Sequence, residues 1–111
     1  MKHVFSVDPN AVVFLNEIYD ECAKLYPMEI YTIAIFWTLN RGVLDENGKY
    51  VLQNKGSYSL VVAKLSDVEN DDKISFAPKK NVAVRLDPRV SDHVGFQISL
   101  SDGDIEIKYT E

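Results

Sequence analysis

The stretch EIYTIAIFWTLN, from Glu29 to Asn40, carries no charge after its first residue. Its side chains alternate with a period of two, which is the spacing of a strand, and both of the resulting faces are mostly apolar. One face comprises Tyr31, Ile33, Ile35, Trp37 and Leu39, and the other comprises Ile30, Thr32, Ala34, Phe36 and Thr38. Aromatic and β-branched residues on both faces favour a central strand of a sheet.

The segment before this strand has the spacing of a helix. Apolar residues recur three and four positions apart between Ala11 and Tyr26, while charged and polar residues fall on the opposite side. Asp8 and Pro9 form a typical helix start, and Pro27 ends the helix. We therefore predict an amphipathic helix from Pro9 to Tyr26. Its apolar stripe, Leu15, Ile18, Cys22 and Leu25, is expected to pack on the face carrying Ile33, Ile35 and Trp37.

Several shorter strands are predicted around this pair. A strand is expected within Lys2–Val7, with Val4 or Phe5 turned inward, and Asn47-Gly48 is a strong hairpin signal between two apolar runs. Gln53 to Gly56 is expected to form another turn, and Ser66 to Asp72 an acidic loop. Asp102-Gly103 predicts a tight turn. The remaining strands are expected at Ser57–Leu65 and in the segments KISFA, VAVRL, VGFQISL and IEIKY.

This order of elements predicts the fold class. We expect α+β, with one N-terminal amphipathic helix packed on a mainly antiparallel, curled β-sheet of about six to eight strands. Parallel pairs are not expected, because the chain lacks the crossover helices that usually join them. The sheet is expected to curl into a small sandwich or a partial barrel. With 111 residues and no linker, residues 1–111 are expected to form a single domain.

Composition and charge exclude several classes of partner. The net charge is −5, and the basic residues are scattered, so nucleic acid is not an expected partner. The apolar segments are shorter than the roughly 20 residues of a membrane-spanning helix, and the N-terminus lacks a secretory signal. A single cysteine, Cys22, fits a reducing compartment. We therefore expect a cytoplasmic protein that does not bind membranes.

No arrangement of residues in the sequence predicts a catalytic or ligand-binding site. His3 and His93 stand far apart without a second ligand at metal-binding spacing, and both are expected to lie at the surface. Cys22 belongs to the apolar stripe of the helix, where a thiol is usually a buried hydrophobe. The glycines form no phosphate-binding motif, and Asp87, Asp102 and Asp104 are typical turn residues. We therefore predict no catalytic, cofactor-binding or metal-binding residues, and no cofactor.

The second half of the chain resembles a known family. The run comprises Asp71-Asp72, Val82 to Pro88, Val94-Gly95 and Ile98, together with Gly56 to Leu60. It resembles the corresponding motifs of HesB-like proteins, the A-type iron–sulfur carriers. The resemblance implies a mostly β body with one packed helix, and a tendency to pair with other copies. That family holds its iron or cluster through one cysteine in the glycine-rich segment and a Cys-x-Cys near the C-terminus, and this chain has no cysteine after Cys22.

These observations predict a small non-catalytic binding or interaction domain. The alternative is an iron–sulfur biosynthesis-related, HesB-like accessory protein without its own cluster ligands, and an enzyme using scattered carboxylates comes third. One helix cannot cover the whole predicted sheet, because it spans little more than two strands in width. We therefore expect a protein partner or a homodimer through the sheet, with Ile30, Phe36, Tyr50 and Tyr58 as candidate contacts.

Overall fold

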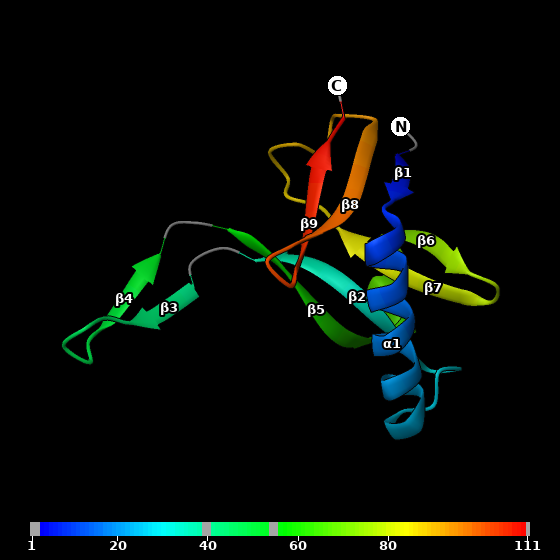
Figure 1. Cartoon of the computed structure of the whole chain (residues 1–111), viewed down its shortest axis with the longest axis horizontal. Coiled ribbons are helices and arrows are strands. Elements are labelled where there is room, and N and C mark those ends of the chain that lie inside the picture. The colour runs from blue at the N-terminus through cyan, green and yellow to red at the C-terminus, as the bar shows by residue number, and fades with distance from the viewer. Residues whose placement is uncertain (1–2, 39–40, 54–55, 111) are drawn as a thin grey trace.

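The computed structural model describes residues 3–38, 41–53 and 56–110. These residues form an α+β fold of one α-helix, one short 3-10 helix and nine strands (Figure 1). The fold class is therefore confirmed, and the strands are more numerous than the predicted six to eight. In chain order the elements are β1 (Val4–Val7), α1 (Pro9–Leu25), β2 (Tyr31–Thr38), β3 (Arg41–Leu44), β4 (Tyr50–Gln53), β5 (Ser57–Lys64), η1 (Leu65–Val68), β6 (Asp72–Ala77), β7 (Lys80–Arg85), β8 (Gly95–Ser101) and β9 (Asp104–Tyr109).

The strands form two mixed sheets and a separate hairpin, in place of the predicted single sheet. One sheet has the order β5-β2-β7-β6, the other has the order β1-β8-β9, and β3 pairs with β4. Pairs β2–β7 and β1–β8 are parallel and the other four pairs among the described residues are antiparallel, so the arrangement is mainly antiparallel as predicted, although the premise that parallel pairing needs a crossover helix is wrong. A parallel connection needs length, which is usually supplied by a helix. Here intervening strands supply it, since β5, η1 and β6 all lie between β2 and β7.

Strand β2 is central, as predicted, and is covered on both faces. Strand β5 pairs with it on one side and β7 on the other. Its Ile33 and Ile35 enter a core that both sheets and α1 share. On the opposite face Val68 of η1 packs against Ala34 and buries it, whereas Ile30, one of the predicted contacts for a partner, is 55% exposed. The predicted acidic loop thus contains a 3-10 helix that covers the sheet.

Helix α1 packs with only part of its predicted stripe. Ala11 and Leu15 are fully buried in the core, and Ile18 and Cys22 pack against it half-buried. Leu25 is 77% exposed, so its predicted place in the contact is wrong. The helix contacts β2, β6 and β8, and Figure 1 shows its C-terminal turns extending beyond the strands, which leaves Leu25 nothing to pack on.

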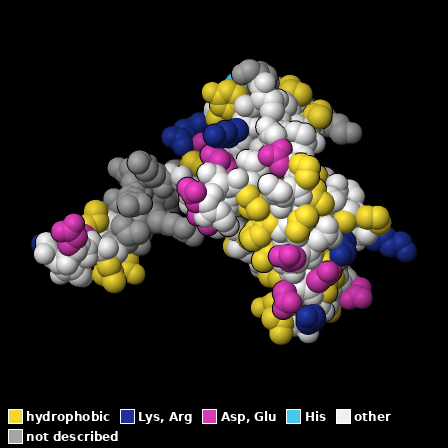
Figure 2. Space-filling view, viewed as in Figure 1, with side chains coloured by type: hydrophobic (Ala, Val, Ile, Leu, Met, Phe, Trp, Pro, Cys, Tyr) yellow, Lys and Arg dark blue, Asp and Glu magenta, His cyan; other side chains and the backbone are white. Residues whose placement is uncertain are grey.

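The predicted Asn47-Gly48 hairpin is present and projects from the body as an arm, β3–β4 (Figure 1). Gly48 has a φ of 75°, a conformation that favours glycine, and the Asp45 carboxylate accepts hydrogen bonds from the backbone N–H groups of Asn47 and Lys49. Hydrophobic side chains lie on the surface of the arm (Figure 2), and Tyr50 is 79% exposed. The predicted turn from Gln53 to Gly56 lies partly outside the described residues.

His3 joins the two sheets on the side of the molecule where β1 and β6 lie. Its Nδ1 lies 2.8 Å from Asp72 Oδ2, and its Nε2 lies 2.7 Å from the carbonyl oxygen of Ser91. The side chain is only 15% exposed, so the expectation of a surface histidine is wrong. Both partners are acceptors, so the protonated ring, which carries two N–H groups, satisfies both. The bond to Ser91, together with Asp72, raises the pKa of His3 above its ordinary value of 6.5.

This raised pKa predicts how stability depends on pH. Because the folded state binds the proton more tightly, the stabilisation from His3 is fully present below a pH of about 6.5 and is lost as the pH rises through the higher folded pKa. Urea denaturation at several pH values between about 6 and 8.5 should show this loss. His3→Gln should remove it, and the control His93→Gln should retain it. An unchanged pH slope in His3→Gln would contradict the assignment.

Candidate functional site: an open groove between β5 and β9

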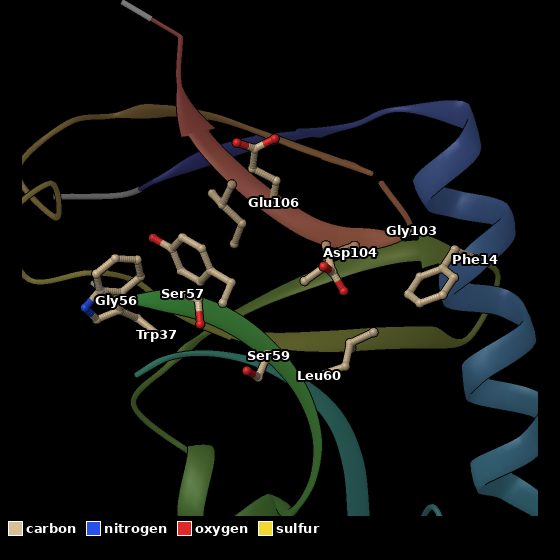
Figure 3. Close-up of a pocket in the computed structure, with 12 residues that line it drawn as sticks. Phe14, Trp37, Gly56, Ser57, Ser59, Leu60, Gly103, Asp104 and Glu106 are labelled. Carbon is tan, nitrogen blue, oxygen red and sulfur yellow. The ribbon is translucent and has the colours of Figure 1, made fainter. Parts of the chain in front are cut away.

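The shared core opens to solvent between β5 and β9. Each of these strands is the last in its sheet, and the two do not pair, so the sheets do not close into a barrel. A hollow of about 550 Å³ lies between them, lined by residues that include Phe14, Leu60 and Asp104 (Figure 3). A second hollow of about 320 Å³ shares Trp37, Tyr58 and Ile107 with the first and continues to Tyr109. We call the two together the edge groove.

The free edge of β9 directs backbone groups into this groove. Strand β9 pairs with β8 in antiparallel register, and the N–H of Thr110 donates to the carbonyl of Gly95 just beyond the paired residues. Residues of an antiparallel strand alternate between bonding to the neighbour and pointing away from it. The N–H and C=O groups of Ile105, Ile107 and Tyr109 therefore point away from β8. All three residues line the edge groove.

Strand β5 presents its free edge in the same way. The N–H of Leu65 donates to the carbonyl of Ile30, directly beyond the antiparallel pairing of β5 with β2. By the same alternation, the backbone groups of Tyr58 and Leu60 point away from β2. Both residues line the larger hollow. The groove is thus bordered by two strand edges whose backbone donors and acceptors have no strand partner among the described residues.

Two aromatic side chains line the groove at the end of β2. The rings of Trp37 and Tyr58 meet edge to face, with centroids 5.0 Å apart. The guanidinium of Arg89 lies 5.4 Å from the Trp37 ring centroid, and Gly56 lies directly against the indole. Trp37 is half-buried and lies outside the core that contains Leu15, so the predicted contact between α1 and Trp37 is wrong. Trp37 belongs to the groove.

Asp87 holds Tyr58 and Arg89 in position. The Asp87 carboxylate is buried, and its Oδ2 accepts hydrogen bonds from Arg89 Nε at 3.1 Å and from Arg89 Nη2 at 2.9 Å. The backbone N–H of Asp87 donates to the Tyr58 hydroxyl at 3.2 Å. The hydrogen bonds from Arg89 lower the pKa of Asp87, so the carboxylate stays charged at neutral pH. Burial raises the pKa of Tyr58. Asp87 was predicted as a turn residue, and its Oδ1 accepts from the backbone N–H of Arg89, as in such a turn.

Two polar atoms in the wall of the groove lack partners. Trp37 Nε1 and Ser57 Oγ are buried, and neither makes a hydrogen bond within the described part of the chain. A buried polar group without a partner costs about 1–3 kcal/mol. Such groups are uncommon in folded proteins and call for an explanation. A bound molecule that supplied an acceptor to Trp37 and a polar atom to Ser57 would remove this cost.

The charges that line the larger hollow are both negative. Asp104 and Glu106 are its charged residues among those described, and both come from β9. Glu106 lies 3.4 Å from Lys108 and is partly neutralised, whereas Asp104 is exposed and forms no ion pair with any described residue. Figure 3 shows the Asp104 side chain directed into the space between β9 and β5. This end of the groove therefore favours a positive charge.

No pattern in the sequence identified this site. We predicted no catalytic, cofactor-binding or metal-binding residues, and those expectations stay predictions. Among the described residues, no three His, Cys, Asp or Glu side chains gather as a metal site would require, and Cys22 is half-buried on α1. The groove exists because β5 and β9 are the edge strands of their sheets, and no local sequence motif indicates which strand lies at an edge. The one signal in the sequence was Trp37, a large aromatic residue near the end of a strand of which Thr32 to Ile35 are buried.

Comparison with known proteins identifies no relative. No family model, curated protein or solved structure matches the chain. Among the described residues, no helix combines the length and the apolar character needed to cross a membrane. The site must therefore be interpreted from its own geometry.

Proposed function

We propose that the protein is a non-catalytic binding domain that holds an extended segment of a partner protein in the edge groove, as an added β-strand. The observation that carries this proposal is the pair of free strand edges, β5 and β9, on the two sides of one open groove. Added strands are a recurrent mode of peptide recognition, in which main-chain hydrogen bonds give affinity and pockets for alternate side chains give specificity.

The length of the groove along β9 fits an extended chain. It follows β9 from Asp104 to Tyr109, six residues that span about 20 Å at about 3.4 Å each. Ile105 and Ile107 are less than 10% exposed, so their edge N–H and C=O groups have little access to bulk water. A bound strand would satisfy these groups directly. Alternate side chains of that strand would contact Trp37 and Tyr58, whose rings supply apolar area for affinity.

Binding fits the geometry better than catalysis does. Ser57 is the hydroxyl buried in the wall of the groove, and no described residue accepts a hydrogen bond from it, so no base activates it as a nucleophile. The buried carboxylate of Asp87 is held by Arg89 in the charged form, which suits a structural role. The iron–sulfur accessory role and the homodimer through the sheet stay predictions, as does a cytoplasmic location.

The proposal predicts which amides a bound strand protects. Hydrogen exchange followed by NMR should show that in the free protein the edge amides of Ile105, Ile107 and Tyr109, which bond to no strand, exchange faster than the paired amides of Glu106 and Lys108. Addition of a peptide selected from a displayed library of random nine-residue sequences should slow the exchange of these amides at least tenfold. The alternate amides of Glu106 and Lys108 should change little, because they already bond to β8. Selected peptides that bind without protecting the edge amides would contradict the added strand.

A further inference from the structure

We infer that the bound segment places an arginine or lysine side chain against Asp104, at the end of the edge groove near Phe14. This inference rests on the proposed function and names the chemistry of the partner. It concerns the larger hollow, where β9 begins and α1 comes near β5. Figure 3 shows the side chains of Phe14, Leu60 and Asp104 around the same space.

Charge is the first argument for a cation. Asp104 and Glu106 are the charged side chains that line the larger hollow in the described part of the chain. Both are acidic, and the whole chain has a net charge of −5, so no long-range field from the protein opposes an incoming cation. Lys108 compensates Glu106 from the same strand, whereas Asp104 has no such partner among the described residues. Asp104 is therefore the carboxylate that a ligand cation would meet.

The apolar lining is the second argument. A lysine or arginine side chain carries a long apolar stem, and Phe14 and Leu60 provide a surface along which such a stem packs. Aromatic rings in this chain already hold guanidinium groups. Arg85 lies over Phe36 at 4.1 Å from the ring centroid, and Arg89 lies near Trp37. The Phe14 ring offers the same kind of contact to a guanidinium of the bound segment. The Asp104 carboxylate lines the same hollow and supplies the opposite charge.

The geometry of an added strand connects this cation site to the free edge. Ile105 follows Asp104 directly and directs its backbone N–H and C=O into the groove. A partner strand bonded there has side chains that alternate above and below the sheet, so one of them lies beside the Asp104 side chain. Cross-strand pairs of opposite charge stabilise a sheet. We expect about a tenfold preference for a cation at low salt, because Asp104 is exposed and partly screened.

Two synthetic peptides test the inference, Ac-TVTRTVT-amide and the same sequence with citrulline in place of arginine. Citrulline keeps the shape of arginine and removes its charge. Trp37 is the single tryptophan of the chain and lines the groove, so its fluorescence reports binding. The arginine peptide should bind about tenfold more tightly than the citrulline peptide in about 20 mM salt, and the preference should shrink in about 500 mM salt.

Asp104→Asn should abolish this preference, because without the carboxylate charge the arginine peptide should bind about tenfold more weakly. Asp102→Asn is the matched control, because Asp102 has a φ of 51° that asparagine tolerates, belongs to the same hairpin and does not line the groove. This control should keep the tenfold preference. Equal binding of both peptides to the wild-type protein would overturn the cation site and leave the added strand intact. Binding of neither peptide, nor of any peptide selected from the random library, would overturn the proposed function itself.

Discussion

Leu15→Ala should lower the free energy of unfolding by about 2–5 kcal/mol, the usual cost of emptying a core site. Leu15 is fully buried, and it belongs to the cluster formed by α1 and the inner faces of both sheets. Removing its side chain therefore leaves a cavity where three layers meet. The neighbours on β2 and β8 belong to hydrogen-bonded strands and cannot collapse freely into that space. Urea denaturation followed by circular dichroism measures the loss.

Leu25→Ala provides the matched control on the same helix. Leu25 is 77% exposed, so its truncation should change stability by about 0.5 kcal/mol or less. If Leu15→Ala fails to fold, Leu15→Val should still show a smaller loss than Leu15→Ala and a larger one than Leu25→Ala. Similar losses for the two alanine variants would show that α1 does not pack as described here.

The sequence predicted the elements whose signals are local. The alternation of Tyr31 to Thr38 identified the central strand, because a strand buried on both faces must be apolar on both. Asn47-Gly48 and Asp102-Gly103 identified two hairpin turns, in which Gly48, Asp102 and Gly103 have the positive φ angles that such turns require. The helix start at Asp8-Pro9 was also correct. Each of these signals depends on a few neighbouring residues and needs no knowledge of the rest of the chain.

The sequence did not predict features that depend on distant pairing. The parallel pairing of β1 with β8 joins Val4 to Gly95, and no local pattern specifies such a partner. The covering of Ala34 by Val68 was missed because the segment SDVEND reads as a solvated acidic loop, although one apolar residue in it turns inward. Leu25 keeps the helical spacing of apolar residues, but it lies beyond the end of the sheet on which the apolar side of the helix was predicted to pack. Amphipathic spacing records which side of a helix is apolar, and it does not record how far the opposing surface extends.

The candidate site was missed for the same reason. The edge groove exists because β5 and β9 each end a sheet, which is a property of the strand order. Its residues come from five parts of the chain, and each has an ordinary role in its own segment. Phe14 reads as part of the apolar side of a helix, Tyr58 as a strand residue, and Asp104 as a turn residue. Trp37 on β2 and Gly56, the residue before β5, lie in contact, so a single substitution at Gly56 tests this part of the groove.

Gly56→Ala should destabilise the protein by about 1–3 kcal/mol and abolish peptide binding in the edge groove. A Cβ atom at this position would lie 1.8 Å from Cζ2 of Trp37, far inside van der Waals contact. The rigid indole must therefore rotate or shift as a whole. Replacing glycine also removes freedom from the unfolded chain, which stabilises by about 0.4–1 kcal/mol and offsets part of the cost. The displaced ring loses its contacts with Tyr58 and Arg89.

Gly95→Ala is the control that separates the clash with Trp37 from the general cost of replacing a glycine. There the nearest atom to the added Cβ is Thr110 Oγ1, at 2.5 Å, which is the end of a small exposed side chain that can rotate away. Stability in this control should change by about 0.5 kcal/mol or less, and peptide binding should persist. In Gly56→Ala the emission of Trp37 should shift to longer wavelength as the indole moves into water. If Gly56→Ala keeps wild-type emission and binds the arginine peptide as before, Trp37 does not form a wall of the groove, and the strand must lie elsewhere along β9.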